Sequence, residues 1–244
     1  MKQSKIQRLS TIFLFCSLLF LLSCDKDEIS FSDVYLTTQQ EVDAFNSTEV
    51  RGYLIIGGSD ITNLNGLQNL TSVENLRIQN SALTNLNGLK NLKSVRWAIE
   101  IWDNDALTNL NGLQNLTSVG RGLSMFDNDA LTNLEGLDNL TSVGGLSIYY
   151  NNALTTLEGL DNLTSIEMHL YVNDNNALTN LNGLENLTSV GGELGISRND
   201  ALTNLCGIRQ LISSISESEY YVYLNAYDPT YDQIKNDGTG GCKE

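Results

Sequence analysis

The feature that most constrains this chain is a short segment, L-x-G-L, that recurs along most of the sequence. Its glycine stands at Gly66, Gly88, Gly112, Gly136, Gly159 and Gly183, and a related Cys-Gly-Ile segment places Gly207 in the same position. Successive glycines are 22, 24, 24, 23, 24 and 24 residues apart. A period this regular predicts a solenoid, in which each repeat forms one coil that stacks on the next.

Residues 144–167 show how one coil is expected to be built. Leu146 and Ile148 alternate with more polar residues, which is the pattern of a half-buried strand. The Asn151-Asn152 pair then marks a turn, since asparagine tolerates left-handed backbone. No stretch favours a helix of about ten residues. We therefore expect a mainly β fold: a right-handed parallel β-helix, or leucine-rich solenoid, of about seven coils of 22 to 24 residues with short capping helices.

The repeat also produces two rows of asparagines. One row comprises Asn80, Asn104, Asn128, Asn151, Asn175 and Asn199, and the other comprises Asn69, Asn91, Asn115, Asn139, Asn162 and Asn186. Stacked amides can bond to one another and to turn carbonyls, so we interpret both rows as structural. The Asn-x-Thr sequons within the second row follow from the repeat, and we do not interpret them as glycosylation sites.

A solenoid exposes two edges, so a cap is expected at each end. Thr38-x-x-Glu41 has the pattern of a capping box that opens a short helix. Near the other end, Tyr220 to Leu224 predicts a last strand, and Asp228-Pro229 predicts the start of a short helix. The chain is thus expected to divide into a signal peptide (1–23), a lipidated N-terminus and tether (24–34), an N-terminal cap with the first strand (35–60), the solenoid (61–212) and a C-terminal cap (213–244).

The first residues have the pattern of a secretory signal peptide. Three basic residues precede an apolar run over residues 12–22, which is shorter than the roughly 20 residues that a transmembrane helix needs. The segment Leu21-Leu22-Ser23-Cys24 resembles the bacterial lipobox, which implies cleavage before Cys24 and attachment of lipid to its thiol. Two acyl chains would give stable anchoring on a membrane. The alternative is an ordinary secretory signal.

The segment that follows, Asp25-Lys26-Asp27-Glu28, resembles the acidic export signal of surface lipoproteins in some Gram-negative lineages. The alternative is a charged tether between lipid and domain. We expect a monomer that is anchored by lipid in the outer membrane and exposed at the cell surface.

Two cysteines are left for a disulfide. Cys16 lies in the predicted signal peptide and Cys24 is the predicted lipidation site, so Cys206 and Cys242 remain. In an oxidising compartment these two cysteines are predicted to join the last repeat to the C-terminal tail. Two free thiols are the alternative, because sequence alone does not fix the geometry.

The charge of the chain argues against nucleic acid as a partner. The predicted signal peptide contains three of the 14 lysines and arginines. The remaining 11 basic residues and the 29 acidic residues give the mature chain a formal charge of −18. Such a surface repels phosphate and sulfate polymers.

Three parts of the sequence carry a resemblance to a known family: Leu36-Thr37-Thr38-Gln39, the repeats, and Asn225-Ala226-Tyr227-Asp228-Pro229-Thr230. Together they resemble receptor L-domain proteins, and most closely the bacterial surface lipoproteins of that family, over nearly all of residues 35–242. The resemblance implies a leucine-rich, β-helix-like module. Similar domains in animal growth-factor receptors bind polypeptides, but their contact residues have no matching motif here, and a shared fold does not transfer a ligand.

One face of the predicted solenoid carries the candidate binding site. In the strand segment L-x-I-x, the last residue points outward, which places Trp102, Phe126 and Tyr149 in one exposed row. The neighbouring candidates are Asp103, Asp127, Tyr150 and Asp174, with Tyr171 in the row before. Aromatic rings flanked by carboxylates suit a sugar ring or a protein segment. The alternative is that these rings only stabilise the sheet.

The sequence favours a binding protein over an enzyme. His169 is the only histidine, and no Ser/His/Asp, Cys/His or metal-ligand set can be assembled around it. A β-helix polysaccharide lyase is the enzyme alternative, but it needs a basic residue beside carboxylates, and Arg77 and Arg198 lie on distant coils. The runner-up to a specific binder is a structural or adhesive spacer in which no single face matters.

We expect neither a cofactor nor a metal ion. The repeated Asp-Asn-Asp at 103–105 and 127–129 groups oxygen atoms of the kind that bind calcium. The glycine pattern of calcium-binding β-helix repeats is absent, however, so polar turns explain the motif.

Overall fold

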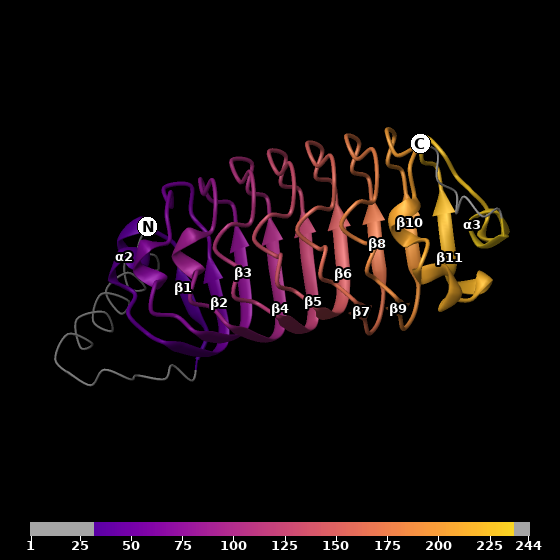
Figure 1. Ribbon diagram of the computed structural model, residues 1–244. Coiled ribbons are helices and arrows are strands. Elements are labelled where there is room, and N and C mark those ends of the chain that lie inside the picture. Colours follow the sequence, from indigo (N-terminus) through magenta and orange to yellow (C-terminus); the bar gives the residue numbers. More distant parts are fainter. Residues whose placement is uncertain (1–31, 237–244) are drawn as a thin grey trace, which may run out of the picture.

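The computed structural model describes residues 32–236 and shows a mainly β protein with one parallel sheet of 11 strands. The strands are β1 (Val34–Leu36), β2 (Glu49–Ile56), β3 (Ser72–Gln79), β4 (Ser94–Trp102), β5 (Ser118–Phe126), β6 (Ser142–Tyr149), β7 (Ser165–Ile166), β8 (Leu170–Asn173), β9 (Ser189–Val190), β10 (Leu194–Ser197) and β11 (Tyr220–Tyr223). Nine of them lie side by side in the order β1-β2-β3-β4-β5-β6-β8-β10-β11 along an elongated body, and the short strands β7 and β9 pair beside this path, which is compatible with a β-solenoid (Figure 1).

The helices are short. The α-helices are α2 (Gln39–Ala44) and α3 (Tyr231–Asn236), and the 3₁₀ helices are η2 (Asn65–Leu67), η3 (Asn87–Leu89), η4 (Cys206–Ile208), η5 (Leu211–Ser213) and η6 (Glu217–Glu219). Each of the helices η2, η3 and η4 coincides with an L-x-G-L or Cys-Gly-Ile segment. The α-helices lie at opposite ends of the sheet, as expected for end caps (Figure 1).

The register of the sheet places equivalent residues of successive repeats beside one another. Leu76 pairs with Ile99, Ile99 with Leu123, and Leu123 with Leu146. All four side chains are buried, as are those two residues further along each strand. Because alternate strand residues point to opposite faces, this pattern leaves one sheet face in the core and the other outside.

Leucines from the rest of each repeat complete the core. In residues 144–167, Leu154, Leu157, Leu160 and Leu163 are fully buried. The same positions are buried in the neighbouring repeats, so one continuous hydrophobic cluster runs from Leu36 to Ile234. Burial of this apolar area is the main term that stabilises the fold.

The first asparagine row forms a buried ladder. The Oδ1 atom of Asn128 accepts from the backbone N–H of Asn104 at 3.2 Å, and the Oδ1 atom of Asn151 accepts from the N–H of Asn128 at 3.2 Å. The ladder continues through Asn175 and Asn199 and ends on Asn225. The prediction was wrong for Asn80, because Ser81 occupies its expected place and donates to Asn104 Oδ1 at 2.7 Å.

The residue before each ladder position has left-handed backbone. These residues are Asn80, Asp103, Asp127, Tyr150, Asp174 and Arg198, with φ between 50° and 57°, and Leu224 has φ 59°. The turn predicted at Asn151-Asn152 is present, but its left-handed residue is Tyr150, directly before this pair. Left-handed backbone at Tyr150 turns the chain so that the amide of Asn151 can point into the core.

The second asparagine row lies on the surface. Asn139 Nδ2 donates to the carbonyl oxygen of Gln114 at 2.7 Å, and Asn91, Asn115, Asn162 and Asn186 each make the equivalent bond to the repeat before. These bonds confirm a structural role for the five asparagines that make them, and each of them links two repeats through a single bond.

The ends of the described chain largely follow the sequence pattern. Thr38 and Glu41 form the predicted capping box at the start of α2. The predicted last strand is β11. The last helix begins at Tyr231, later than Asp228-Pro229, because the hydroxyl of Thr230 accepts from the N–H of Gln233 and caps it. Cys206 is disulfide-bonded, and its predicted partner, Cys242, lies outside the described residues.

Candidate functional site

The outer face of the sheet presents three parallel rows of residues. The first row contains Ala98, Gly122 and Gly145; the second contains Glu100, Ser124, Ser147 and Tyr171; the third contains Trp102, Phe126, Tyr149 and Asn173. The register confirms the predicted alignment of Trp102, Phe126 and Tyr149 across β4, β5 and β6. Of the residues in the first two rows, only Tyr171 was predicted to form part of a site.

Trp102 is not the exposed contact that the row predicts. Its side chain is only partly accessible, and the guanidinium carbon of Arg77 lies 4.7 Å from the centre of its ring. Its indole N–H is buried and has no hydrogen-bond partner among the described residues. Arg77 is held in place by an ion pair of 2.5 Å with Glu100. Arg77 therefore lies over the Trp102 ring, and this ring is less accessible than the row predicts.

The remaining aromatic residues form a connected group that we call the aromatic cluster: Phe126, Tyr149, Tyr150, Tyr171 and His169. The Phe126 ring lies 5.1 Å from that of Tyr150 in an edge-to-face arrangement and 6.5 Å from that of Tyr149. Tyr149 is 6.5 Å from Tyr171, whose ring stacks on His169 at 4.5 Å. Such contacts favour a rigid surface. Phe126 and Tyr150 are the most exposed members, at 37% and 39%.

Hydrogen bonds fix two of the tyrosines. Tyr171 donates its phenolic hydrogen to Glu193, and this bond, followed by burial, raises the pKa of Tyr171 to about 12. Burial raises the pKa of Tyr149. Both phenols are therefore neutral donors at physiological pH.

The predicted carboxylates lie at the left-handed positions that follow the strands. Asp103 and Asp127 adjoin Trp102 and Phe126 directly, and Asp174 follows the end of β8. Burial raises the pKa of Asp127, and the charges of Asp103, Asp129 and Asp105 raise it further. This end of the strands is thus an acidic border to the aromatic cluster.

Replacing Asp127 with asparagine is expected to raise stability slightly. Because the pKa of Asp127 is raised in the folded protein, its ionised form disfavours folding, and stability declines as the pH rises through that pKa. Asparagine removes the charge and also tolerates left-handed backbone. The free energy of unfolding in urea at pH 7 should increase by a few tenths of a kcal/mol, and the gain should shrink in about 0.5 M salt. A loss of stability would contradict this account.

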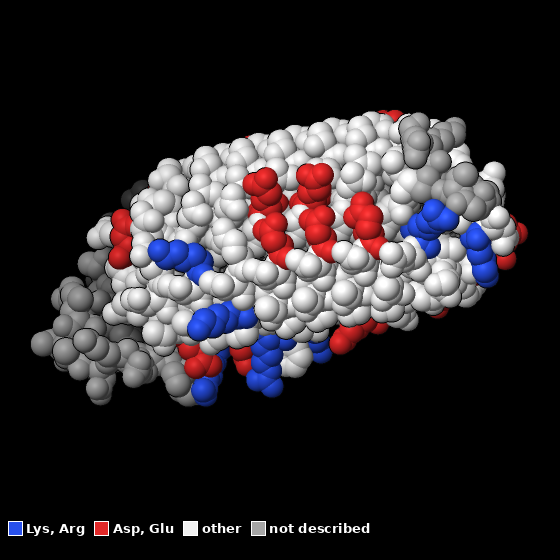
Figure 2. Space-filling model, viewed as in Figure 1, with Lys and Arg blue, Asp and Glu red and all other residues white. Residues whose placement is uncertain are grey.

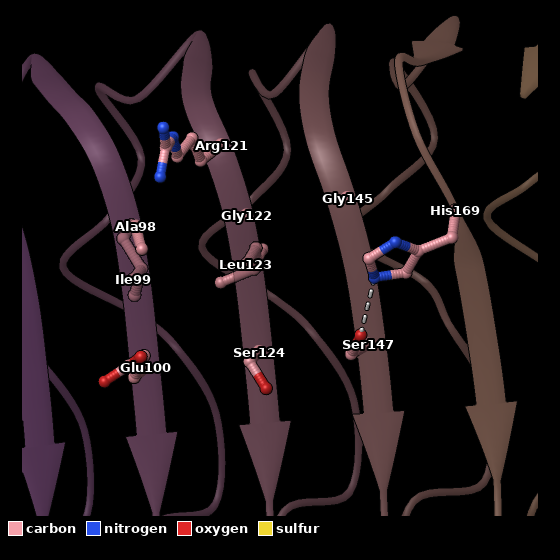
Figure 3. A pocket seen from close by; sticks show the side chains of 10 residues that line it. All are labelled: Ala98, Ile99, Glu100, Arg121, Gly122, Leu123, Ser124, Gly145, Ser147 and His169. Atoms are coloured by element: carbon pink, nitrogen blue, oxygen red, sulfur yellow. Dashed lines mark hydrogen bonds between the residues drawn. The ribbon is translucent and has the colours of Figure 1, made fainter. Parts of the chain in front are cut away.

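A shallow hollow of about 210 Å³ lies in the same sheet face, beside the aromatic cluster. We call it the sheet groove; its lining includes the first row, Glu100, Ser124 and Ser147 from the second row, Arg121 and His169. Figure 3 shows Arg121 and His169 on either side of the glycines, with Glu100, Ser124 and Ser147 aligned across three strands. The groove and the aromatic cluster share His169 and form one continuous surface.

His169 was expected only as the residue before Leu170. In the structure its ring extends over Gly145 of the neighbouring strand, and its Nε2 atom lies 3.3 Å from Ser147 Oγ. No ion pair joins His169 to a carboxylate within residues 32–236. The geometry is therefore that of a wall of the groove and not of a Ser/His/Asp set. The lack of a side chain at Gly145 is the sequence signal for this contact.

The charges on the rest of the surface are mostly negative. Figure 2 shows acidic side chains gathered over the middle of one side of the rod. Within the described part of the chain, no group of three or more His, Cys, Asp or Glu residues is arranged to hold a metal ion. None of the helices in residues 32–236 is long and apolar enough to cross a membrane.

Comparisons with known proteins found no matching family model, no matching curated protein and no matching solved structure. The likeness to receptor L-domain proteins stays a prediction from the sequence. Cys24 and the predicted signal peptide lie outside the described residues, so the anchor also stays a prediction.

Proposed function

We propose that this chain is a non-catalytic, lipid-anchored protein of the cell envelope that binds a glycan or a protein segment through the outer face of its sheet. The observation that carries the proposal is the aromatic cluster. Five rings from three adjacent chain segments contact one another, and the two most exposed ones, Phe126 and Tyr150, border a row of carboxylates. Rigid aromatic surfaces with polar borders are typical of binding sites.

The proposed framework is a right-handed β-helix of about seven coils, similar to a receptor L domain. The parallel register and the asparagine ladder support it, because both require equivalent residues of successive repeats to stack. In this proposal lipid on Cys24 anchors the protein in the outer membrane, at the cell surface. A disulfide between Cys206 and Cys242 closes the C-terminal cap, and the bonded state of Cys206 supports that pairing.

A structural spacer is the second candidate function. The arrangement of Trp102 favours it, since that ring is engaged by Arg77 and contributes to the packing of the sheet. In a spacer, exchanging a residue of the aromatic cluster would alter no interaction with a partner.

Replacing Phe126 with alanine is expected to weaken partner binding at least tenfold, because the ring is the most accessible member of its row and anchors of this kind dominate interfaces. The purified protein is first screened on glycan and protein arrays, and the affinity of each variant for the strongest hit is then measured. Tyr35 on β1 provides the control, since it is 58% exposed and lies at the far edge of the sheet. Tyr35→Ala should bind normally. Equal affinity of Phe126→Ala and the unmodified protein would favour the spacer.

A further inference from the structure

We propose that the sheet groove holds one pyranose ring of a glycan, so that the proposed binding face recognises carbohydrate. This inference rests on the proposed function and assigns its ligand class. The groove lies in the middle of the sheet, over β4, β5 and β6, where Ala98 is paired with Gly122 and Gly122 with Gly145.

The size of the groove limits its occupant to a small ring. Ala98 contributes only a methyl group to the floor and Gly122 contributes no side chain, so the surface is low over these two residues, and the His169 ring over Gly145 closes the next position. The resulting hollow of about 210 Å³ is smaller than the roughly 300–1,000 Å³ of sites for larger ligands.

The polar groups of the groove match the hydroxyls of a sugar. Glu100, Ser124 and Ser147 line one side at the spacing of neighbouring strands, about 4.8 Å, and offer carboxylate and hydroxyl oxygens. Ser124 makes no side-chain hydrogen bond within the described residues, so its hydroxyl is available to a ligand. Glu100 and Ser147 are positioned by Arg77 and His169. Sugar hydroxyls both donate and accept, which suits this mixture.

The ends of the groove are a cation and a flat ring. Arg121 is oriented by Trp97, whose ring centre lies 5.0 Å from the guanidinium carbon. His169 is stacked on Tyr171, and its ring lies over Gly145. Arg77 forms an ion pair with Glu100, so the negative charge of Glu100 is balanced within the groove. Unlike the carboxylate row at the strand ends, the groove can therefore accept both neutral and carboxylate-bearing sugars.

A peptide fits the groove less well than a sugar. Peptides that bind to sheets usually add a strand at an exposed edge through backbone hydrogen bonds. Strands β4, β5 and β6 are internal and paired on both sides, so they offer no such edge. Binding here depends on side-chain oxygens and on ring contacts.

The groove also leads to the aromatic cluster. Gly122, Ser124 and Phe126 are alternate residues of β5 and lie on the same face. The distance from Gly122 to Phe126 is about 13 Å along the strand. A short oligosaccharide can therefore occupy the groove with one ring and stack on Phe126 with another.

Titration of the purified protein with simple sugars tests the proposal. The probes are the methyl glycosides of glucose, galactose, mannose and N-acetylglucosamine, and sodium glucuronate. Saturation-transfer NMR detects binding, and fluorescence locates it, because both tryptophans of the chain, Trp97 and Trp102, lie on β4 beside the groove. Saturable binding of at least one probe is expected, and no binding of any probe up to roughly 100 mM would overturn the proposal.

Gly122→Val is the deciding variant. A Cβ atom at Gly122 meets only the carbonyl oxygen of Gly145, at 3.6 Å, so the backbone has room for a side chain there, and the two methyl groups of valine are chosen to fill the floor. Affinity for the bound sugar should fall at least tenfold while the circular dichroism spectrum and melting temperature stay unchanged. Ser124→Ala removes one hydroxyl without filling the groove and should weaken binding about fivefold. Unchanged affinity in Gly122→Val would overturn the assignment of the groove.

Phe126→Ala separates this inference from the proposed function. If the strongest array partner is lost in Phe126→Ala but bound normally by Gly122→Val, the binding face stands and the groove assignment fails. If neither variant loses any partner, both proposals fail.

Discussion

Replacing Asn128 with alanine is expected to lower the free energy of unfolding by roughly 3 kcal/mol or more. The side chain is fully buried and bonds to both neighbouring repeats. Its Oδ1 atom accepts from the backbone N–H and from the side-chain amide of Asn104, each at 3.2 Å. Its Nδ2 atom donates to Asn151 Oδ1 at 3.1 Å and to the carbonyl oxygen of Ile101 at 3.0 Å.

The expected loss is large because alanine leaves these partners buried without replacements. Each buried polar group without a partner costs about 1–3 kcal/mol, and Asn128 Oδ1 is the acceptor that the N–H of Asn104 has within residues 32–236. Alanine also opens a space next to the leucine core, which adds a cavity term. The loss also weakens the neighbouring positions, because Asn104 and Asn151 are themselves hydrogen-bonded to further residues of the ladder.

Urea unfolding followed by circular dichroism measures the effect. Asn139→Ala is the matched control, because Asn139 is exposed and makes a single bond to the carbonyl oxygen of Gln114. The control should lose about 1 kcal/mol or less. Similar losses in the two variants would show that the buried ladder contributes no more than surface amides do.

The parallel fold could be predicted because it follows from the period of the sequence. Apolar residues at fixed positions in a repeat of 22 to 24 residues allow strands to stack in register. The alignment of Trp102, Phe126 and Tyr149 could therefore be predicted from the sequence, whereas the solvent exposure of each ring could not. The capping box at Thr38 was equally accessible, since it depends on two residues three positions apart. Local patterns and exact repeats need no knowledge of long-range contacts.

The features that the repeat does not determine could not be predicted. Arg77 covers Trp102 because these two side chains, from different repeats, meet across neighbouring strands, and neither position is constant in the repeat. The groove depends on the coincidence of Ala98, Gly122 and Gly145 in three adjacent repeats and on His169, whose ring lies over the last of them. Side-chain exposure is thus a property of neighbours, which a single repeat does not encode.

Replacing Gly136 with alanine is expected to lower the free energy of unfolding by about 4 kcal/mol, from backbone strain and overpacking together. Gly136 has φ of +109°, a conformation that residues with a side chain rarely adopt. A Cβ atom there would lie 2.1 Å from the carbonyl oxygen of Leu110 in the preceding repeat. Because that oxygen belongs to the backbone, the two repeats would have to separate to make room.

Gly122→Ala is the matched control for this prediction. It makes the same chemical change in the same repeat, on β5, where the added Cβ atom lies 3.6 Å from its nearest contact. Because alanine restricts the unfolded chain more than glycine does, the free energy of unfolding of Gly122→Ala should stay unchanged or rise by up to about 1 kcal/mol. Chemical denaturation of both variants gives the comparison directly. If Gly136→Ala were as stable as Gly122→Ala, the close stacking of the L-x-G-L segments would not be what requires glycine in the repeat.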